Sequence, residues 1–282
     1  MQFNFDNVDV AVNRSGILST NSSINTNNSI EAAYVLGYSR PINQLPFGSI
    51  KTTFNSTYFP VINQEPNFAV VNKIKSMIND SGYLGERVEF AGLHHDYWFL
   101  DSYSLKVQPN NIVETTVNYS TFWQLCGGTL RPKSNQINYL DQGSCMHSWS
   151  TYILSSGDYM NKPIYDFSYS FQANWRPIYI IGKKFPVEVK LLGASETISF
   201  NTDEYRAVLF TGENVYPNLL DSNNGNIQFR NISIICMDGC DSTGDSSASL
   251  NLNVSGFKIK SITPVVQVGQ TLRVTYLAEK YY

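Results

Sequence analysis

Apolar and polar residues alternate along much of the chain, with the period of two that is typical of half-buried β-strands. Residues 103–108 read Tyr-Ser-Leu-Lys-Val-Gln, and the Pro-Asn-Asn sequence that follows them favours a turn. Residues 112–119 are rich in β-branched side chains and complete a predicted β-hairpin. A second hairpin is predicted from residues 257–262, a turn near Pro264 and residues 271–276.

One segment has a helical period, between Glu65 and Ile78. Pro66 stands where a first-turn proline is favoured, and an Asn-Asp-Ser-Gly sequence at 79–82 favours the end of a helix. Apolar residues recur every three or four positions, at Phe68, Val71, Ile74 and Met77–Ile78, whereas the polar residues Asn72, Lys73 and Lys75 are predicted to face away. The segment is predicted to be an amphipathic helix packed on a sheet.

The sequence contains a weak internal repeat. Sliding the chain along itself aligns residues 11–42 with residues 147–178 without a gap. The seven identities in these 32 positions include the Arg-Pro-Ile sequences that begin at Arg40 and Arg176. Each copy then continues into further strands and ends in one of the two predicted hairpins, which favours a duplication.

The duplication predicts two tandem β-sandwich or barrel-like modules, at residues 1–130 and 145–282, joined by a linker at 131–144. The second copy is longer, and residues 221–249 are rich in Asn, Asp, Ser and Gly, so that an inserted loop is expected there. The predicted fold class is mainly β, with the amphipathic helix packed on the first module.

Composition favours a structural protein with a polar, weakly charged surface. Only 15% of the 282 residues are charged, whereas globular proteins usually contain about 25%. The 29 Asn and 31 Ser residues supply polarity without charge. The net charge of −3 argues against a protein that coats nucleic acid, which usually has a basic face.

No segment of the sequence indicates membrane insertion. The first residues lack a basic region followed by an apolar core, and no window contains the 18 or so apolar residues of a membrane span. The four cysteines, Cys126, Cys145, Cys236 and Cys240, are therefore interpreted as reduced thiols of a protein assembled in a cytoplasm.

The candidate metal-binding and catalytic motifs are incomplete. His94-His95-Asp96 is the best metal-like cluster, but adjacent residues of a strand point to opposite faces, which favours a loop or sheet-edge role. Cys236 and Cys240 lack a second cysteine pair, so a structural thiol pair is favoured, and a lone disulfide or a zinc site completed by the histidines remains open. The sequence contains no nucleophile elbow and no phosphate-binding loop. We expect no catalytic residue, metal or cofactor.

Arg40 and Arg176 are the candidate subunit-interface residues, because the repeat places each of them before a proline at equivalent positions. A proline in such a place marks a strand edge or a bulge. Each arginine is a candidate partner for a carboxylate on a neighbouring subunit, and the alternative is a surface arginine within its own module.

Taken together, the β-rich module, its helix, the closing hairpin and the tandem copy resemble the tail tube and tube-like hub proteins of tailed bacteriophages. The hairpin that carries the resemblance runs from Ser102 to Asn110 and returns from Ile112 to Tyr119. The Asn-, Ser-, Thr- and Tyr-rich surface is also similar to that of phage virion proteins. The resemblance spans nearly the whole chain and rests on architecture.

The resemblance implies a virion tail protein without catalytic residues. Modules of that family join their strands with those of neighbouring subunits around a channel, as hexamers or, in tandem proteins, as trimers with pseudo-sixfold symmetry. Closure removes exposed sheet edges. The implied partners are further copies of the chain and other tail or baseplate proteins, with DNA only as passing cargo, and assembly takes place in the host cytoplasm.

Three other functions remain as alternatives. The chain could be another virion component, such as a neck, capsid-decorating or fibre-associated protein. It could be a carbohydrate-binding β-sandwich, although core packing is favoured for its four tryptophans, Trp98, Trp123, Trp149 and Trp175. A hydrolase on a β scaffold is disfavoured, since no site for it is found.

Overall fold

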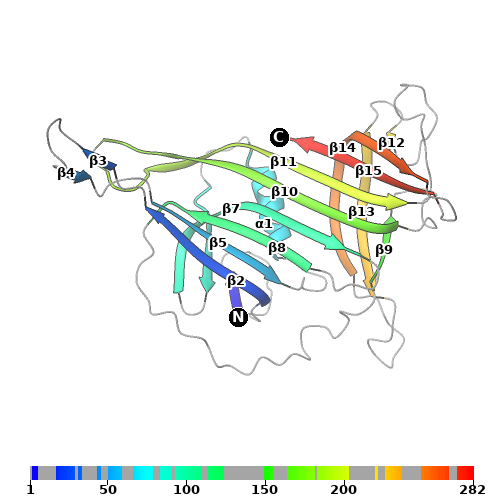
Figure 1. Ribbon diagram of the computed structural model, residues 1–282, viewed down its shortest axis with the longest axis horizontal. Coiled ribbons are helices and arrows are strands. Elements are labelled where there is room, and N and C mark those ends of the chain that lie inside the picture. Colours follow the sequence, from blue (N-terminus) through cyan, green and yellow to red (C-terminus); the bar gives the residue numbers. More distant parts are fainter. Residues whose placement is uncertain are drawn as a thin grey trace.

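The described strands form one continuous antiparallel sheet of thirteen strands and a separate two-stranded sheet, with one helix packed against the larger sheet (Figure 1). This confirms the predicted mainly β fold. The computed structural model describes residues 2–5, 17–28, 31–33, 43–45, 50–58, 66–78, 83–90, 93–108, 114–123, 149–154, 164–181, 183–202, 220–221, 226–236, 249–266 and 272–282. Within these ranges, no helix is long and apolar enough to cross a membrane.

The elements divide between two halves of the chain. The first half contributes β1 (Gln2–Phe5), β2 (Ile17–Asn28), β3 (Glu31–Ala33), β4 (Asn43–Leu45), β5 (Ile50–Tyr58), α1 (Pro66–Ser76), β6 (Glu86–Phe90), β7 (Leu93–Val107) and β8 (Glu114–Thr121). The second half contributes β9 (Trp149–Leu154), β10 (Ile164–Ile178), β11 (Glu188–Thr202), β12 (Leu220–Asp221), β13 (Asn226–Cys236), β14 (Ser249–Val265) and β15 (Arg273–Tyr281).

Both predicted hairpins are present, as β7–β8 and β14–β15. The strands of both hairpins are longer than predicted, since β7 begins at Leu93, β14 begins at Ser249 and β15 ends at Tyr281. Pro264, predicted to lie near the turn, is instead within β14, opposite Val274 of β15. A proline in a strand is tolerated at a sheet edge, where its missing N–H is not needed.

Part of the expected inserted loop is a strand. Residues 226–236 form β13, which pairs with β14 on one side and with β9 on the other. The local Asn and Gly residues favour turns. Ile227 and Phe229 nevertheless alternate with polar residues, as do Ile232 and Ile234 beyond an irregularity of the register, and the segment pairs with β14. The linker at 131–144 lies outside the described residues.

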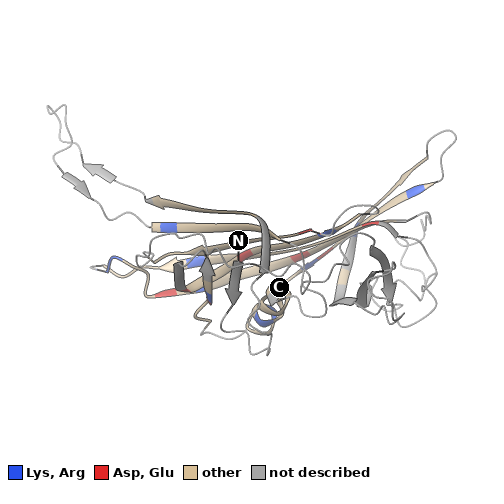
Figure 2. Ribbon diagram, turned by 90° about the horizontal axis from the view of Figure 1, so that it is seen from below, with Lys and Arg blue, Asp and Glu red and all other residues tan. Residues whose placement is uncertain are grey.

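The helix α1 has the predicted period and lies on one side of the sheet (Figure 2). Its side chains Phe68, Val70, Val71 and Ile74 are buried. The prediction for Lys75 was wrong: its side chain is only 14% exposed. It reaches a carboxylate on the second half of the chain, which helical periodicity cannot reveal.

The core lies between α1 and the long strands. Every second residue of β5, β7, β10, β11 and β15 points into it, and its largest fully buried side chains are tyrosines and phenylalanines. The alternate residues form an opposite face that is mainly Ser, Thr and Asn. The long strands are therefore covered on one face and polar on the other.

A backbone turn beside β6 depends on a glycine. Gly85 has a φ of +84°, in the left-handed region that favours glycine, and Tyr97 on the neighbouring strand has a φ of 71°. A Cβ added to Gly85 would lie 2.8 Å from the carbonyl oxygen of Trp98. Only glycine fits this approach without moving the backbone.

We expect Gly85→Ala to lower the free energy of unfolding by about 2 kcal/mol, through the strained φ and the backbone clash. Urea denaturation followed by tryptophan fluorescence measures the change. The exposed neighbour Leu84, 71% accessible, provides the control, and Leu84→Ala should change stability by less than about 0.5 kcal/mol. Equal effects of the two substitutions would contradict the role of Gly85.

Candidate assembly interface

The two halves of the chain meet in the middle of the sheet, where β7 pairs with β10. Leu105 lies opposite Tyr169 and Tyr103 lies opposite Phe171, and all four side chains are fully buried. Phe68 of α1 packs edge-on against the ring of Tyr169, with centroids 5.6 Å apart. We call this β7–β10 pairing the internal joint. It is a continuous ladder, and its apolar face is covered by α1.

Buried polar contacts anchor α1 to both halves. In the first turn of the helix, Asn67 donates to the Tyr58 hydroxyl on β5 and accepts from the Tyr119 hydroxyl on β8, the latter at 2.7 Å. In its last turn, Lys75 Nζ lies 2.7 Å from Glu196 Oε1 on β11. The helix therefore spans the internal joint and restrains the two halves relative to each other.

Glu196 is a buried carboxylate, only 1% exposed, with three hydrogen-bond donors. Besides Lys75, the Tyr169 hydroxyl donates to Oε1 and the Tyr282 hydroxyl donates to Oε2 at 2.5 Å. Backbone hydrogen bonds between Tyr282 and Ala194 hold Tyr282 beside this carboxylate. A buried charge is tolerated when it is paired and hydrogen-bonded in this way.

The tyrosines of this cluster resist ionisation. Burial, followed by the charge of Glu196, raises the pKa of Tyr169 well above its usual value of 10.0. Burial, followed by the hydrogen bond to Glu196, also raises the pKa of Tyr282. Both hydroxyls therefore stay protonated and continue to donate to Glu196 in moderately alkaline solution.

Aromatic packing extends the internal joint towards the other end of β10. The indole Nε1 of Trp175 donates to the Leu100 carbonyl oxygen at 2.8 Å. The Tyr83 ring stacks on Trp175 with centroids 5.4 Å apart, and the Phe99 ring lies 5.1 Å from it. Trp175 is therefore committed to packing between the halves.

The order of strand pairing is the same in the two halves. In the first half, the order is β1-β6-β7-β8-β5-β2, and in the second half it is β9-β13-β14-β15-β11-β10. Each strand thus has a counterpart: β2 corresponds to β10, β5 to β11, β7 to β14 and β8 to β15. The two halves share this strand order. In the first half β1 also pairs with β2, and no pairing of β9 with β10 is described in the second half.

The β-bulges make this correspondence residue-specific. A bulge lies between Leu100 and Ser102 of β7, and another lies between Ile259 and Ser261 of β14. Adding 159 to both residue numbers converts every β7–β8 pair into a β14–β15 pair. The two hairpins therefore share the same register and the same bulge position, which supports a common origin of the two halves.

The other two hairpin strands match equally well. Bulges lie between Ser19 and Asn21 of β2 and between Ile164 and Asp166 of β10. Adding 145 to β2 and 144 to β5 converts the β2–β5 pairs into β10–β11 pairs. Adding 144 to β5 and 159 to β8 likewise converts the β5–β8 ladder into the β11–β15 ladder. The two halves therefore contain the same four-stranded unit.

Two strands keep an edge that pairs with no strand of the described ranges. In β2, residues 23–28 pair only with β5, and in β14, residues 259–265 pair only with β15. β2 contains no charged residue and no proline, which are common protections of an exposed edge. This edge was not predicted, although twelve consecutive uncharged residues in the sequence signal it.

The face opposite the core is joined by polar side chains. Asn118 donates to the Ser102 hydroxyl at 2.7 Å, and the Thr275 hydroxyl donates to Asn201 Oδ1 at 2.6 Å. Thr57 and Thr116 share a hydrogen bond of 3.3 Å. The face is therefore hydrophilic without a concentration of charge, and charged residues are sparse along the long strands in Figure 2.

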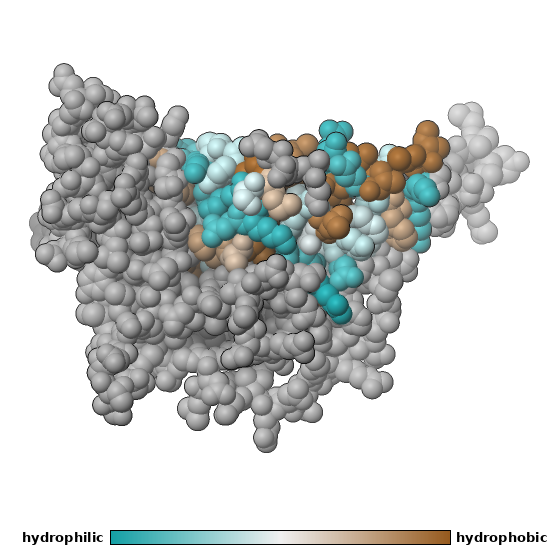
Figure 3. Space-filling view, turned by 180° about the vertical axis from the view of Figure 1, so that it is seen from behind, coloured by the Kyte–Doolittle hydropathy of each residue, from teal (hydrophilic) through white to brown (hydrophobic). Residues whose placement is uncertain are grey.

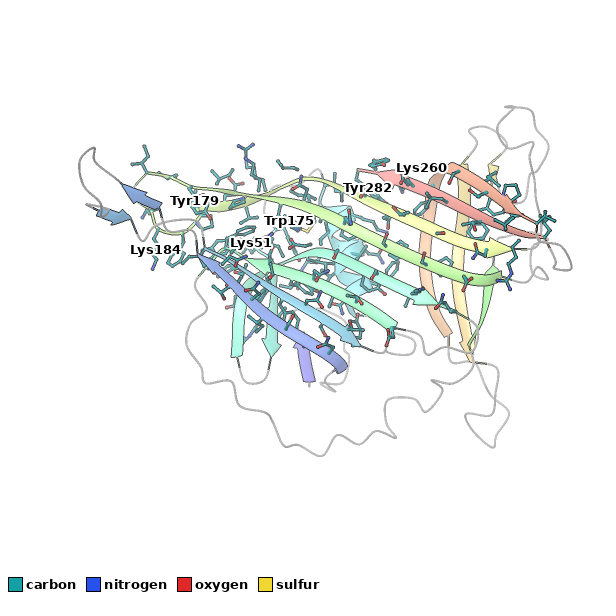
Figure 4. The ribbon with its side chains drawn as sticks, viewed as in Figure 1. Lys51, Trp175, Tyr179, Lys184, Lys260 and Tyr282 are labelled. Carbon is teal, nitrogen blue, oxygen red and sulfur yellow. The ribbon has the colours of Figure 1, made fainter. Side chains whose placement is uncertain are left out.

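A separate apolar surface lies at the end of the β10–β11 hairpin, where hydrophobic side chains gather in Figure 3. Ile180, Ile181 and Val187 are 54%, 102% and 48% exposed. Figure 4 places Tyr179 and Lys184 of this end far from Lys260 on β14. The hairpin end is thus distinct from the open edge of β14.

The strand pairing does not follow the alignment from which Arg40 and Arg176 were predicted to be equivalent. Strand pairing matches β2 with β10, whereas the alignment that equates Arg40 with Arg176 places Ile17 of β2 against Ile153 of β9. Arg176 is exposed on β10 opposite Lys190, and no described carboxylate pairs with it. Arg40 lies outside the described residues.

The other candidate residues are placed as follows. His94 and His95 lie on β7 opposite Glu89 and Val88, and the described residues include no group of metal-binding side chains.

Cys236 ends β13, whereas the other three cysteines lie outside the described residues. Trp98 is buried, Trp123 is half-buried against Phe99, and Trp149 begins β9.

We expect Lys75→Met to lower the free energy of unfolding by about 3 kcal/mol, because it leaves the Glu196 charge buried without its cation. Urea denaturation gives the value. The double variant Lys75→Met/Glu196→Gln removes the charge as well, and it should be more stable than the single variant. A double variant that is less stable would contradict the charge pairing.

We also expect stability to fall as the pH rises above about 10. The pKa of Tyr169 is higher in the folded chain than in the unfolded chain, so the folded chain binds more protons above the unfolded pKa. Unfolding midpoints in urea between about pH 8 and about pH 11 measure the slope. Tyr169→Phe should make that slope shallower, and an unchanged slope would contradict the assignment.

Comparison with known proteins gives no family for this chain. No protein-family model matches it, and no curated protein matches it.

Proposed function

We propose that this chain is a non-catalytic structural protein of a phage-type tail, which assembles into rings around a channel as a tail tube, a terminal ring or a tube-like hub. One observation carries the proposal. The described residues contain the same four-stranded unit twice, joined edge to edge, and within them residues 23–28 of β2 and 259–265 of β14 have no strand on their outer side.

The open edges support ring formation. The edge strand β14 corresponds to β7, and the edge strand β2 corresponds to β10. Because β7 and β10 pair within the chain, β14 of one copy has a matching partner in β2 of another copy. A head-to-tail contact between different edges closes into a ring if its rotation divides a full turn, and closure leaves no exposed edge. Three chains would supply the six modules of the rings that the resemblance implies, and six chains are the alternative.

The polar face supports a conduit for DNA. It presents hydroxyl and amide groups that hydrogen-bond to one another across the strands. DNA is bound mainly through contacts of Lys and Arg with its phosphates. A face poor in these residues holds passing DNA weakly, as a channel requires. Other tail or baseplate proteins would then contact the ring from above and below.

Solution mass and negative-stain imaging of the purified chain test the proposal. We expect a species of three or six times the 31.8 kDa chain mass, which forms rings with a central hole. A chain that stays at 31.8 kDa across the concentration range would contradict ring formation. A disc without a hole would contradict the conduit.

Lysines placed on the β14 edge should reduce assembly. Val265 and Val266 are 46% and 73% exposed, so Val265→Lys/Val266→Lys adds charge at the edge without disturbing the core. The matched control is Ile180→Lys/Ile181→Lys at the β10–β11 hairpin end. Assembly lost only in the edge variant supports the edge contact, whereas equal assembly of both variants would contradict it.

A further inference from the structure

The internal joint between β7 and β10 is a template for contacts between copies. Ser104 of β7 lies directly opposite Ser170 of β10 in that joint. The correspondence between the halves converts Ser104 into Thr263 of β14, and it converts Ser170 into Asn25 of β2. Both residues lie on edges that pair with no described strand, at the two ends of the strand order β2-β5-β8-β7-β10-β11-β15-β14.

We propose that β14 of one copy pairs antiparallel with β2 of the next copy, with Thr263 opposite Asn25. This inference rests on the ring proposed above and names its partner surface and register. The same correspondence places Ile262 opposite Thr26, Pro264 opposite Ile24 and Ser261 opposite Asn27. The joint between copies thereby repeats the internal joint at every position of this segment.

The facing residues are compatible with this register. Thr26 and Ile24 are on the face of β2 that points towards the core, since their partners on β5 are the buried Thr52 and Phe54. Ile262 packs partly against the same core in the second half. Side chains of one face therefore meet side chains of the same face, as continuous pleating requires.

The joint between copies is weaker than the internal joint. It has Ile24 where the internal joint has Tyr169, and Pro264 where the internal joint has Leu105. Smaller side chains bury less apolar area, and Pro264 has no N–H to donate. Thr52 stands at the position of Glu196, so the carboxylate that binds Lys75 of α1 inside the chain is replaced by a hydroxyl at this position.

This difference predicts that the chain folds before copies associate. The internal joint forms once within each chain and stays closed, whereas the joint between copies forms at a concentration set by its weaker contacts. Its surface is also uncharged on the β2 side, so that salt should change association little. The chain can thus fold as a unit and assemble afterwards.

Engineered disulfides test the register in the full chain. In a background with the four native cysteines changed to Ser, Asn25→Cys/Thr263→Cys should link different copies on mild oxidation. Directly opposed Cβ atoms lie about 5 Å apart, near the roughly 4 Å of a disulfide, whereas diagonal neighbours lie about 7–8 Å apart. The diagonal pair Asn25→Cys/Ser261→Cys should therefore link about tenfold less.

The internal pair provides the matched control. Ser104→Cys/Ser170→Cys should form a disulfide within one chain, at the position that the two edges copy. Non-reducing gel electrophoresis separates the products, because only links between copies give multiples of the 31.8 kDa chain. If the cysteine-free background does not assemble, the native cysteines are retained and peptide mass spectrometry identifies the links.

The outcomes separate the register from the ring. Links through Asn25→Cys/Thr263→Cys that stop at closed rings support both. The same links in open filaments support the register and overturn the ring. Rings in which the diagonal pair links better, or in which neither pair links while Ser104→Cys/Ser170→Cys does, overturn the register and leave the ring standing.

A charge exchange gives a second test without oxidation. Asn25→Lys/Thr263→Lys places like charges opposite each other and should reduce the assembled fraction. Asn25→Lys/Thr263→Glu places opposite charges there and should restore it. Sedimentation velocity measures the fraction, and equal fractions for the two variants would overturn the register.

Discussion

The position of α1 across the internal joint is the constraint on which the rest of the structure depends. The helix binds β5 and β8 through Asn67, and it binds β11 through Lys75. The two contacts lie on different halves of the chain, and Phe68 packs on the joint between them. The halves therefore keep one relative orientation, which also sets the directions of the two outer edges.

This rigidity gives the repeated four-stranded unit its significance. A flexible link between two equal units would leave their outer edges in variable directions, and no single rotation would relate one chain to the next. With the joint held by a buried ladder and by Glu196, each chain presents β2 and β14 at a defined angle. A ring of the proposed kind needs such a definition, because small angular errors accumulate over several subunits.

The two faces of the long strands serve different purposes in this arrangement. One face buries tyrosines and phenylalanines beneath α1 and holds the chain together. The other face satisfies its polar groups by hydrogen bonds across neighbouring strands, such as Asn118 with Ser102. The few charged residues of the sequence are thus consistent with a polar face built mainly from Ser, Thr and Asn side chains.

The sequence by itself determined the local features of this protein. The period of two identified β7–β8 and β14–β15, and the helical period identified α1, because burial of one face imposes these periods on neighbouring residues. Lys75 escaped this reasoning, since its partner Glu196 lies far away in the sequence, on the other half of the chain. A helical wheel assigns a face to a side chain but not the groups that meet it.

Only the tertiary structure decided how the halves correspond and where they meet. The ungapped alignment matched Ile17 of β2 with Ile153 of β9. The strand pairing instead matches Asn25 of β2 with Ser170 of β10, and Ser104 of β7 with Thr263 of β14. The duplicated units keep their bulges and registers, while most of their side chains differ. Backbone hydrogen bonds form the ladders, and nearly any side chain permits them, so that register persists where sequence similarity does not.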